Sequence, residues 1–71
     1  MKNRLQKYRW DKDWTVGQLA KYANVSKSTI TLIENGKTKN PSVEVAFKIA
    51  DALGVDVRDI FYYDWQEGNY K

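Results

Sequence analysis

The chain has 71 residues and a formal net charge of +3, with 12 Lys or Arg, 9 Asp or Glu, and neither Cys nor His. This length allows one domain with a modest core, and the lack of Cys and His excludes a disulfide framework, a thiolate nucleophile and the usual zinc ligand sets. No apolar run approaches the ~20 residues that span a bilayer, and none follows the basic amino terminus as a secretory signal would, so we expect a cytoplasmic protein with no membrane partner.

The first predicted helix runs from about residue 2 to residue 12. Leu5 and Tyr8 are spaced as on one side of a helix, and Trp10 is a further apolar residue of the segment. Neither this segment nor any later one shows the alternation expected of a strand. The chain therefore belongs to the all-α class on sequence grounds.

A second helix is predicted to begin after Thr15. The Thr15 hydroxyl can accept a hydrogen bond from an amide of the first turn, while the Gln18 side chain reaches back to the Thr15 amide. Trp14 before the cap can also pack against Leu19 beyond it. These signals together indicate a well-defined helix start.

A third helix is predicted to begin eleven residues later, after Ser26, where Val25 can pack on Ile30. The tight corner between the two helices needs a residue at positive φ, which Gly adopts freely and Asn tolerates better than most. We place that corner at Asn24. The spacing predicts a helix-turn-helix; two ordinary consecutive helices in a small bundle are the alternative.

The third helix should end at Asn35 and Gly36, since Gly is the usual residue just past a helix end. The polar segment 37–41 then reads as an exposed loop. Ser42 is predicted to cap a fourth helix, whose apolar residues keep the helical period until Gly54 ends it.

A fifth helix is predicted from a cap at Asp56, with Phe61 continuing its apolar face before the pattern fades near Asp64. We therefore expect one helix-turn-helix domain over residues 1–63. The remaining residues, 64–71, form an aromatic C-terminal tail.

Charge is distributed unevenly along the chain. Residues 1–41 contain nine Lys or Arg against three Asp or Glu, whereas residues 42–71 contain three against six. Positive charge gathered around a helix-turn-helix is expected of a protein that binds phosphates. The alternative is a solvated surface whose asymmetry is due to chance.

Seven short segments share the order and spacing of a known family: Leu19-Ala20, Val25-Ser26, Ile30, Ile33-Glu34-Asn35-Gly36, Pro41-Ser42, Ile49-Ala50 and Leu53-Gly54-Val55. Over residues 4–61 the chain resembles the XRE or Cro-type helix-turn-helix family of bacterial and phage repressors. This resemblance implies a compact bundle of five short helices, the lambda repressor-like DNA-binding fold, and double-stranded DNA as the partner.

The two sides of the third helix can be assigned from its period of about 100° per residue. Ile30 and Ile33, with Thr29 beside them, fall on one side, which is expected to face the core. The opposite strip carries four residues that the resemblance implies read bases in the major groove: Lys27, Ser28, Thr31 and Leu32. Simple solvent exposure of this strip is the alternative.

Phosphate contacts are a second expectation from the resemblance. The helix start at Thr15 and the loop carrying Asn35, Lys37 and Lys39 would lie along the DNA backbone. Many relatives have Gln after the cap, where this chain has Val16. Three other side chains are candidates to replace that contact: Lys12, Gln18 and Lys21. The turn after the third helix can also be read as a purely structural cap.

Arg9 and Glu34 match two residues that form an ion pair in phage repressors of this type. The resemblance therefore implies a pair that ties the first helix to the end of the recognition helix. Unpaired surface charges are the alternative.

The C-terminal segment carries more aromatic surface than one short helix can bury. We expect this surface to form a homodimer interface, because these modules commonly bind as two-fold dimers and aromatic residues are favoured at interface cores. The expected interface residues are Phe61, Tyr62, Tyr63 and Trp65. Folding back over Trp10 or Trp14, or docking of a different protein, are the alternatives.

The sequence thus predicts a sequence-specific DNA-binding transcriptional regulator, a repressor that acts as a homodimer on a near-palindromic operator. The alternative is a protein-interaction module of antitoxin or adaptor type with the same fold; RNA binding is a weaker third option, since the chain shows no RNA-module signature. No acid–base pair, activated nucleophile or metal set can be assembled, so we expect no enzymatic activity, no cofactor, no metal and no small-molecule substrate.

Overall fold

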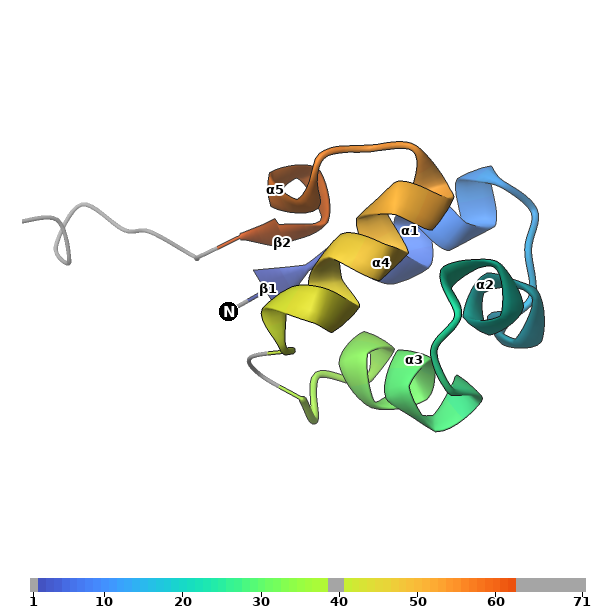
Figure 1. Cartoon of the computed structure of the whole chain (residues 1–71), viewed down its shortest axis with the longest axis horizontal. Helices are drawn as coiled ribbons and strands as arrows, with labels where there is room; N and C mark the ends of the chain where they lie inside the picture. The colour runs from blue at the N-terminus through green and yellow to red at the C-terminus, as the bar shows by residue number, and fades with distance from the viewer. Residues whose placement is uncertain (1, 39–40, 63–71) are drawn as a thin grey trace, which may run out of the picture.

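The computed structural model describes residues 2–38 and 41–62, which form five helices and two very short strands (Figure 1). None of these helices is long and apolar enough to cross a membrane. In chain order the elements are β1 (Lys2–Asn3), α1 (Leu5–Asp11), α2 (Val16–Ala23), α3 (Lys27–Glu34), α4 (Val43–Leu53), α5 (Val57–Ile60) and β2 (Phe61–Tyr62).

Four of the helices start at the predicted caps. The Thr15 hydroxyl accepts the Gln18 amide at 3.1 Å, and the Gln18 side-chain oxygen accepts the Thr15 amide at 2.8 Å. Ser26, Ser42 and Asp56 each accept an amide of the following turn through their side-chain oxygens, at 3.1, 3.2 and 2.8 Å. The caps satisfy amides that have no partner within the helix, which is why the sequence located these starts correctly.

Three helices end at a left-handed residue, which directly follows α2 and α4 and comes one residue later after α3. Asn24, Gly36 and Gly54 have φ angles of 60°, 75° and 71°. In each case the amide of the next residue donates to a carbonyl in the last helical turn, at 3.0, 2.9 and 3.1 Å. This is the Schellman arrangement. The predicted corner at Asn24 is confirmed.

The core lies where α4 meets its neighbours. In Figure 1, α4 passes through the middle of the molecule, with α5 and β2 on one side and α3 on the other. Apolar residues from every helix and from β2 meet there: Leu5, Leu19, Ala20, Ala23, Ile30, Ile33, Ala46, Ile49, Ala50, Leu53, Ile60 and Phe61. Burial of these side chains is the main stabilising contribution to a domain of this size.

The two ends of the described chain differ from the sequence prediction. The first helix begins at Leu5 rather than near residue 2, because Lys2 and Asn3 pair antiparallel with Tyr62 and Phe61. The predicted absence of strands is therefore wrong for these four residues. The fifth helix likewise ends at Ile60, and Phe61 is extended, with φ −110° and ψ 126°.

The reason for this difference is pairing between distant parts of the chain. The Arg4 amide donates to the Ile60 carbonyl at 2.8 Å, which closes the two ends against each other. A four-residue helix gains little from cooperative propagation, so strand pairing decides the conformation of the residues beyond it. A spacing that looks helical within one segment cannot reveal such a partner.

Candidate nucleic-acid interface

Helix α3 presents one polar strip to the outside and anchors the opposite side in the core. Ile30 and Ile33 are fully buried, as predicted. The four residues expected to face outward are all exposed: Lys27, Ser28, Thr31 and Leu32. Leu32 is 43% exposed, a high value for a leucine. The predicted orientation of this helix is confirmed; contact of the strip with bases stays a prediction.

The Lys27 side chain does not simply extend into solvent. A Cβ placed on Gly17 would lie 3.7 Å from Lys27 Cε and 3.9 Å from Lys27 Cδ, so the lysine stem crosses the first turn of α2. The starts of α2 and α3 therefore form one continuous surface. Lys27 brings a positive charge toward the region where Val16 replaces the polar residue of many relatives.

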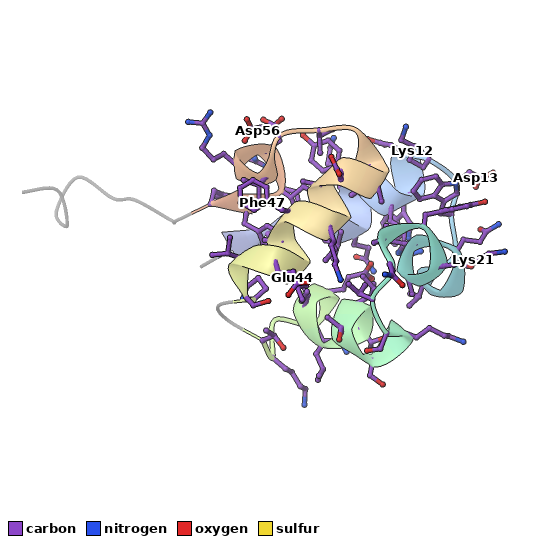
Figure 2. The ribbon with its side chains drawn as sticks, in the orientation of Figure 1. Lys12, Asp13, Lys21, Glu44, Phe47 and Asp56 are labelled. Carbon is purple, nitrogen blue, oxygen red and sulfur yellow. The ribbon has the colours of Figure 1, made fainter. Side chains whose placement is uncertain are left out.

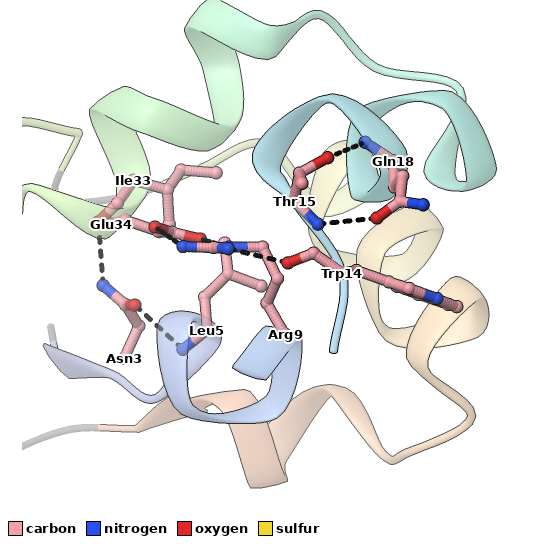
Figure 3. Close-up of polar contacts among 8 residues, drawn as sticks. All are labelled: Asn3, Leu5, Arg9, Trp14, Thr15, Gln18, Ile33 and Glu34. Atoms are coloured by element: carbon pink, nitrogen blue, oxygen red, sulfur yellow. Dashed lines mark hydrogen bonds and ion pairs between the residues drawn. The ribbon is translucent and has the colours of Figure 1, made fainter. Parts of the chain in front are cut away.

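The polar groups of Thr15 and Gln18 bond to each other in the capping box at the start of α2 (Figure 3). Both residues are exposed. Because the Gln18 carbonyl accepts the Thr15 amide, a phosphate contact from Gln18 would have to come from its side-chain NH₂ group. Lys12 projects from the edge of the molecule away from α3, which makes it a poor substitute for the missing contact (Figure 2).

The turn after α3 is held rigidly to the helix. Two successive amides, those of Lys37 and Thr38, donate to the Leu32 carbonyl at 2.9 and 3.2 Å. The Asn35 and Lys37 side chains are exposed beside the strip. Lys39, the third phosphate-binding candidate of this turn, lies outside the described residues.

Arg9 and Glu34 form the ion pair that the resemblance implied (Figure 3). Arg9 Nε donates to Glu34 Oε2 at 2.7 Å and Arg9 Nη2 donates to Glu34 Oε1 at 3.1 Å. The side chains are only 10% and 5% exposed. The hydrogen bond to Glu34 raises the pKa of the Arg9 guanidinium. A third bond, from Arg9 Nη1 to the Trp14 carbonyl at 2.8 Å, ties the segment before α2 to the same group.

Asn3 is a positioning residue that the sequence analysis missed. Its side-chain NH₂ group donates to the Ile33 carbonyl at 3.0 Å, and its side-chain oxygen accepts the Leu5 amide at 3.1 Å (Figure 3). From the position before the N-cap residue Arg4, Asn3 thus accepts the first amide of α1 and also holds the end of α3. An Asn two residues before the first apolar position was an available cap signal, but the helix was predicted to start before it.

The predicted interface residues at the C-terminal end fall into different environments. Phe61 is 9% exposed and belongs to the core of its own chain, so it offers little surface to a partner. Tyr62 is half-buried, and the Arg4 guanidinium lies over its ring, 4.1 Å from the centroid. Tyr63 and Trp65 lie outside the described residues.

Trp10 and Trp14, over which the tail would fold back in the alternative arrangement, also lie in different environments. Trp10 is 62% exposed on α1. Trp14 packs against the core and against Tyr22, with 4.7 Å between ring centroids. Among the described residues, no group of three or more acidic side chains is arranged to hold a metal ion.

This geometry agrees with that of known proteins. The model of the family described as Helix-turn-helix matches residues 5–60. An HTH-type transcriptional regulator of Methanocaldococcus jannaschii is 48% identical over 67 residues, which make up 94% of this chain and 100% of that protein. Another, of Archaeoglobus fulgidus, is 37% identical over 67 residues, 94% of this chain and 93% of that protein.

Among solved structures, the N-terminal DNA binding domain of SinR from Bacillus subtilis superposes with a TM-score of 0.79 and 30% sequence identity. The superposition covers 89% of this chain and 91% of that chain. The five helices expected from the sequence are present in the described residues, and their arrangement superposes on that domain. With the family model matching most of its length, this chain belongs to the helix-turn-helix family, whose similar members are named as transcriptional regulators.

Proposed function

We propose that this protein binds double-stranded DNA sequence-specifically, with α3 in the major groove, and thereby regulates transcription. The observation that carries the proposal is the exposed strip of α3, backed by buried isoleucines and by the Arg9–Glu34 pair. A reading element needs this combination, because side chains that discriminate bases must be held in a fixed position. The similar SinR domain is itself named as DNA-binding.

The four strip residues supply suitable chemistry for base edges. Lys27 can donate to guanine O6 or N7, and the hydroxyls of Ser28 and Thr31 can donate or accept. Leu32 can contact only the thymine methyl group. Because the Lys27 stem crosses the first turn of α2, its ammonium is also within the region where a phosphate contact is expected.

Contacts to the DNA backbone would set the register of α3 in the groove. The proposed phosphate-binding residues are Thr15, Gln18, Asn35, Lys37 and Lys39. A helix start suits an anion because its amides and its dipole both favour negative charge. Binding should therefore weaken steeply as salt is added.

We further propose that the protein is a repressor that acts in the cytoplasm by occupancy. A homodimer on a near-palindromic operator that overlaps a promoter would exclude polymerase, since two-fold protein symmetry is mirrored in the site. The proposed contact between the copies is the aromatic C-terminal segment, including Tyr62, Tyr63 and Trp65 beside Phe61. The family is one of transcription regulators rather than enzymes.

Selection of bound sequences from random duplex DNA tests the proposal. Once a site is known, Lys27→Ala and Ser28→Ala should each lose discrimination at particular base pairs, by about 1–3 kcal/mol per contact. Lys12→Ala is the matched control for Lys27→Ala, because it removes the same charge at the edge away from α3. If Lys27→Ala instead weakened binding equally for all DNA sequences, Lys27 would be assigned to the DNA backbone rather than to a base.

The alternative function is that of a protein-interaction module, for which the acidic, aromatic C-terminal part would be the binding surface. The dependence of binding affinity on salt concentration distinguishes the two functions. DNA binding that stays absent even in dilute buffer, together with a salt-insensitive affinity for a protein, would favour the interaction module.

A further inference from the structure

An open apolar groove of about 240 Å³ lies between α4 and the segment formed by α5 and β2. Two residues of α4 on its edge are unusually exposed for apolar side chains, Val43 at 72% and Phe47 at 57%. Figure 2 shows Phe47 projecting from α4 on the side where β2 and α5 lie. The opposite side of the groove is lined by Val57, Arg58 and Phe61.

The chain leaves the described region directly beside this groove. Phe61 lines the groove, whereas the next residue, Tyr62, lies against the Arg4 guanidinium. Side chains alternate between the two faces of an extended chain. In an extended continuation of β2, Tyr63 and Trp65 would share the face of Phe61.

We propose that the C-terminal segment of the same chain occupies this groove, with Tyr63 and Trp65 packed against Val43 and Phe47. Each aromatic side chain buries about 150–250 Å² when covered, so two of them can cover the exposed α4 edge and the groove together. Exposure to water is unfavourable for both the aromatic tail and the apolar edge of α4, and this packing would remove both from water.

Charge supports this placement. In the same extended continuation, Asp64 would share the face of Tyr62, whose ring lies 4.1 Å from the Arg4 guanidinium. The segment 64–71 carries two acidic residues and one Lys, and the groove margin carries the exposed Arg58. The acidic segment is thus complementary to Arg4, whereas Arg58 already pairs with Asp56 at 3.2 Å.

Distance favours the same chain over a second copy. Tyr63 is two residues from Phe61, and Trp65 is four, which corresponds to about 7 and 13 Å of extended chain. A segment tethered this closely competes at an effective concentration in the millimolar range, far above that of a second copy at micromolar concentration. Packing in the groove leaves Tyr62, on the opposite face of the segment, for the proposed dimer, and it does not depend on DNA binding.

Nuclear Overhauser contacts in the full chain test the proposal directly. In a mixture of isotope-labelled and unlabelled protein, we expect contacts from the Trp65 indole protons to the Val43 methyl groups and the Phe47 ring, all within one molecule. Their absence would overturn the proposal. Contacts seen only between labelled and unlabelled molecules would also overturn it, because they would place the segment on a second copy.

A pair of substitutions provides a second, thermodynamic test. Trp65→Ala should lower the unfolding temperature by several degrees in the wild-type background and by less than half as much in a Phe47→Ala background, because contacting residues are not additive. Trp10→Ala, which removes an exposed tryptophan of α1, is the control and should shift the temperature equally in both backgrounds. Equal shifts for Trp65→Ala in both backgrounds would refute the packing, whatever the DNA-binding result.

Discussion

Arg9 shows how a single side chain can organise three segments. Its guanidinium bonds both oxygens of Glu34 and the Trp14 carbonyl, and the Arg9 and Glu34 side chains are only 10% and 5% exposed. Burying an ion pair costs desolvation energy that the mutual attraction only partly repays. We interpret the pair as fixing the position of the α3 end relative to α1, more than as adding net stability.

Replacing Arg9 with Met should destabilise the protein by about 3–5 kcal/mol, because Glu34 would be left buried without a partner. Urea denaturation followed by circular dichroism measures this loss. The double variant Arg9→Met with Glu34→Met should recover part of it, since no charge is then buried alone. An unchanged unfolding midpoint and unchanged DNA affinity for Arg9→Met would mean that the pair has no role.

At the scale of elements, α5 depends on its cap more than the longer helices do. It has four residues, and its capping box joins Asp56 and Asp59 reciprocally. Asp56 also accepts hydrogen bonds from the Arg58 side chain at 3.2 Å and from the Arg58 amide at 2.8 Å. These two interactions, the side-chain bond first, lower the pKa of the Asp56 carboxyl. The cap thus makes α5 sensitive to acid.

Asp56→Asn should reduce stability at neutral pH and have little effect in acid. A carboxyl whose pKa is lowered by folding stabilises the fold at pH above its unfolded value of about 3.9, and loses this effect as the pH falls through the folded value. Unfolding temperatures of the wild type and the variant should therefore differ at about pH 7 and converge as the pH falls through the lowered folded pKa of Asp56. Asp51→Asn, on the exposed surface of α4, is the control for charge alone. A difference that persists in acid would contradict the mechanism.

At the scale of the whole molecule, the proposed DNA-reading helix and the aromatic end lie on different sides. In Figure 1, α3 occupies one edge, α5 and β2 the other, and α4 lies between them. The separation allows one surface to contact DNA while the other contacts a second copy. Two copies related by a two-fold axis could then present both α3 helices to one duplex.

Sedimentation at micromolar concentration should show a homodimer, and Tyr62→Ser should weaken it because this half-buried ring lies at the proposed interface. Trp10→Ser serves as the control, since it removes an aromatic side chain on α1. A monomer both in free solution and on an operator duplex would refute the proposed dimer.

Local features were predictable because the interactions that produce them span only a few residues. The caps at Thr15, Ser26 and Ser42 each bond an amide three residues on. The corner at Asn24 follows from backbone sterics, and the outward strip follows from helical periodicity. Most of the candidate interface could therefore be placed from the sequence, while the ion pair of Arg9 needed the family resemblance in addition.

Tertiary structure alone decided the features that join distant residues. Strand pairing of Lys2–Asn3 with Phe61–Tyr62 joins the two ends of the described chain, and the bond from Asn3 to Ile33 spans 30 residues. The Lys27 stem over Gly17 and the groove beside Phe61 likewise exist only once the helices have packed. The sequence by itself determined where helices begin, end and face, because those choices are made within one or two turns; which surfaces then meet depends on how the whole core packs.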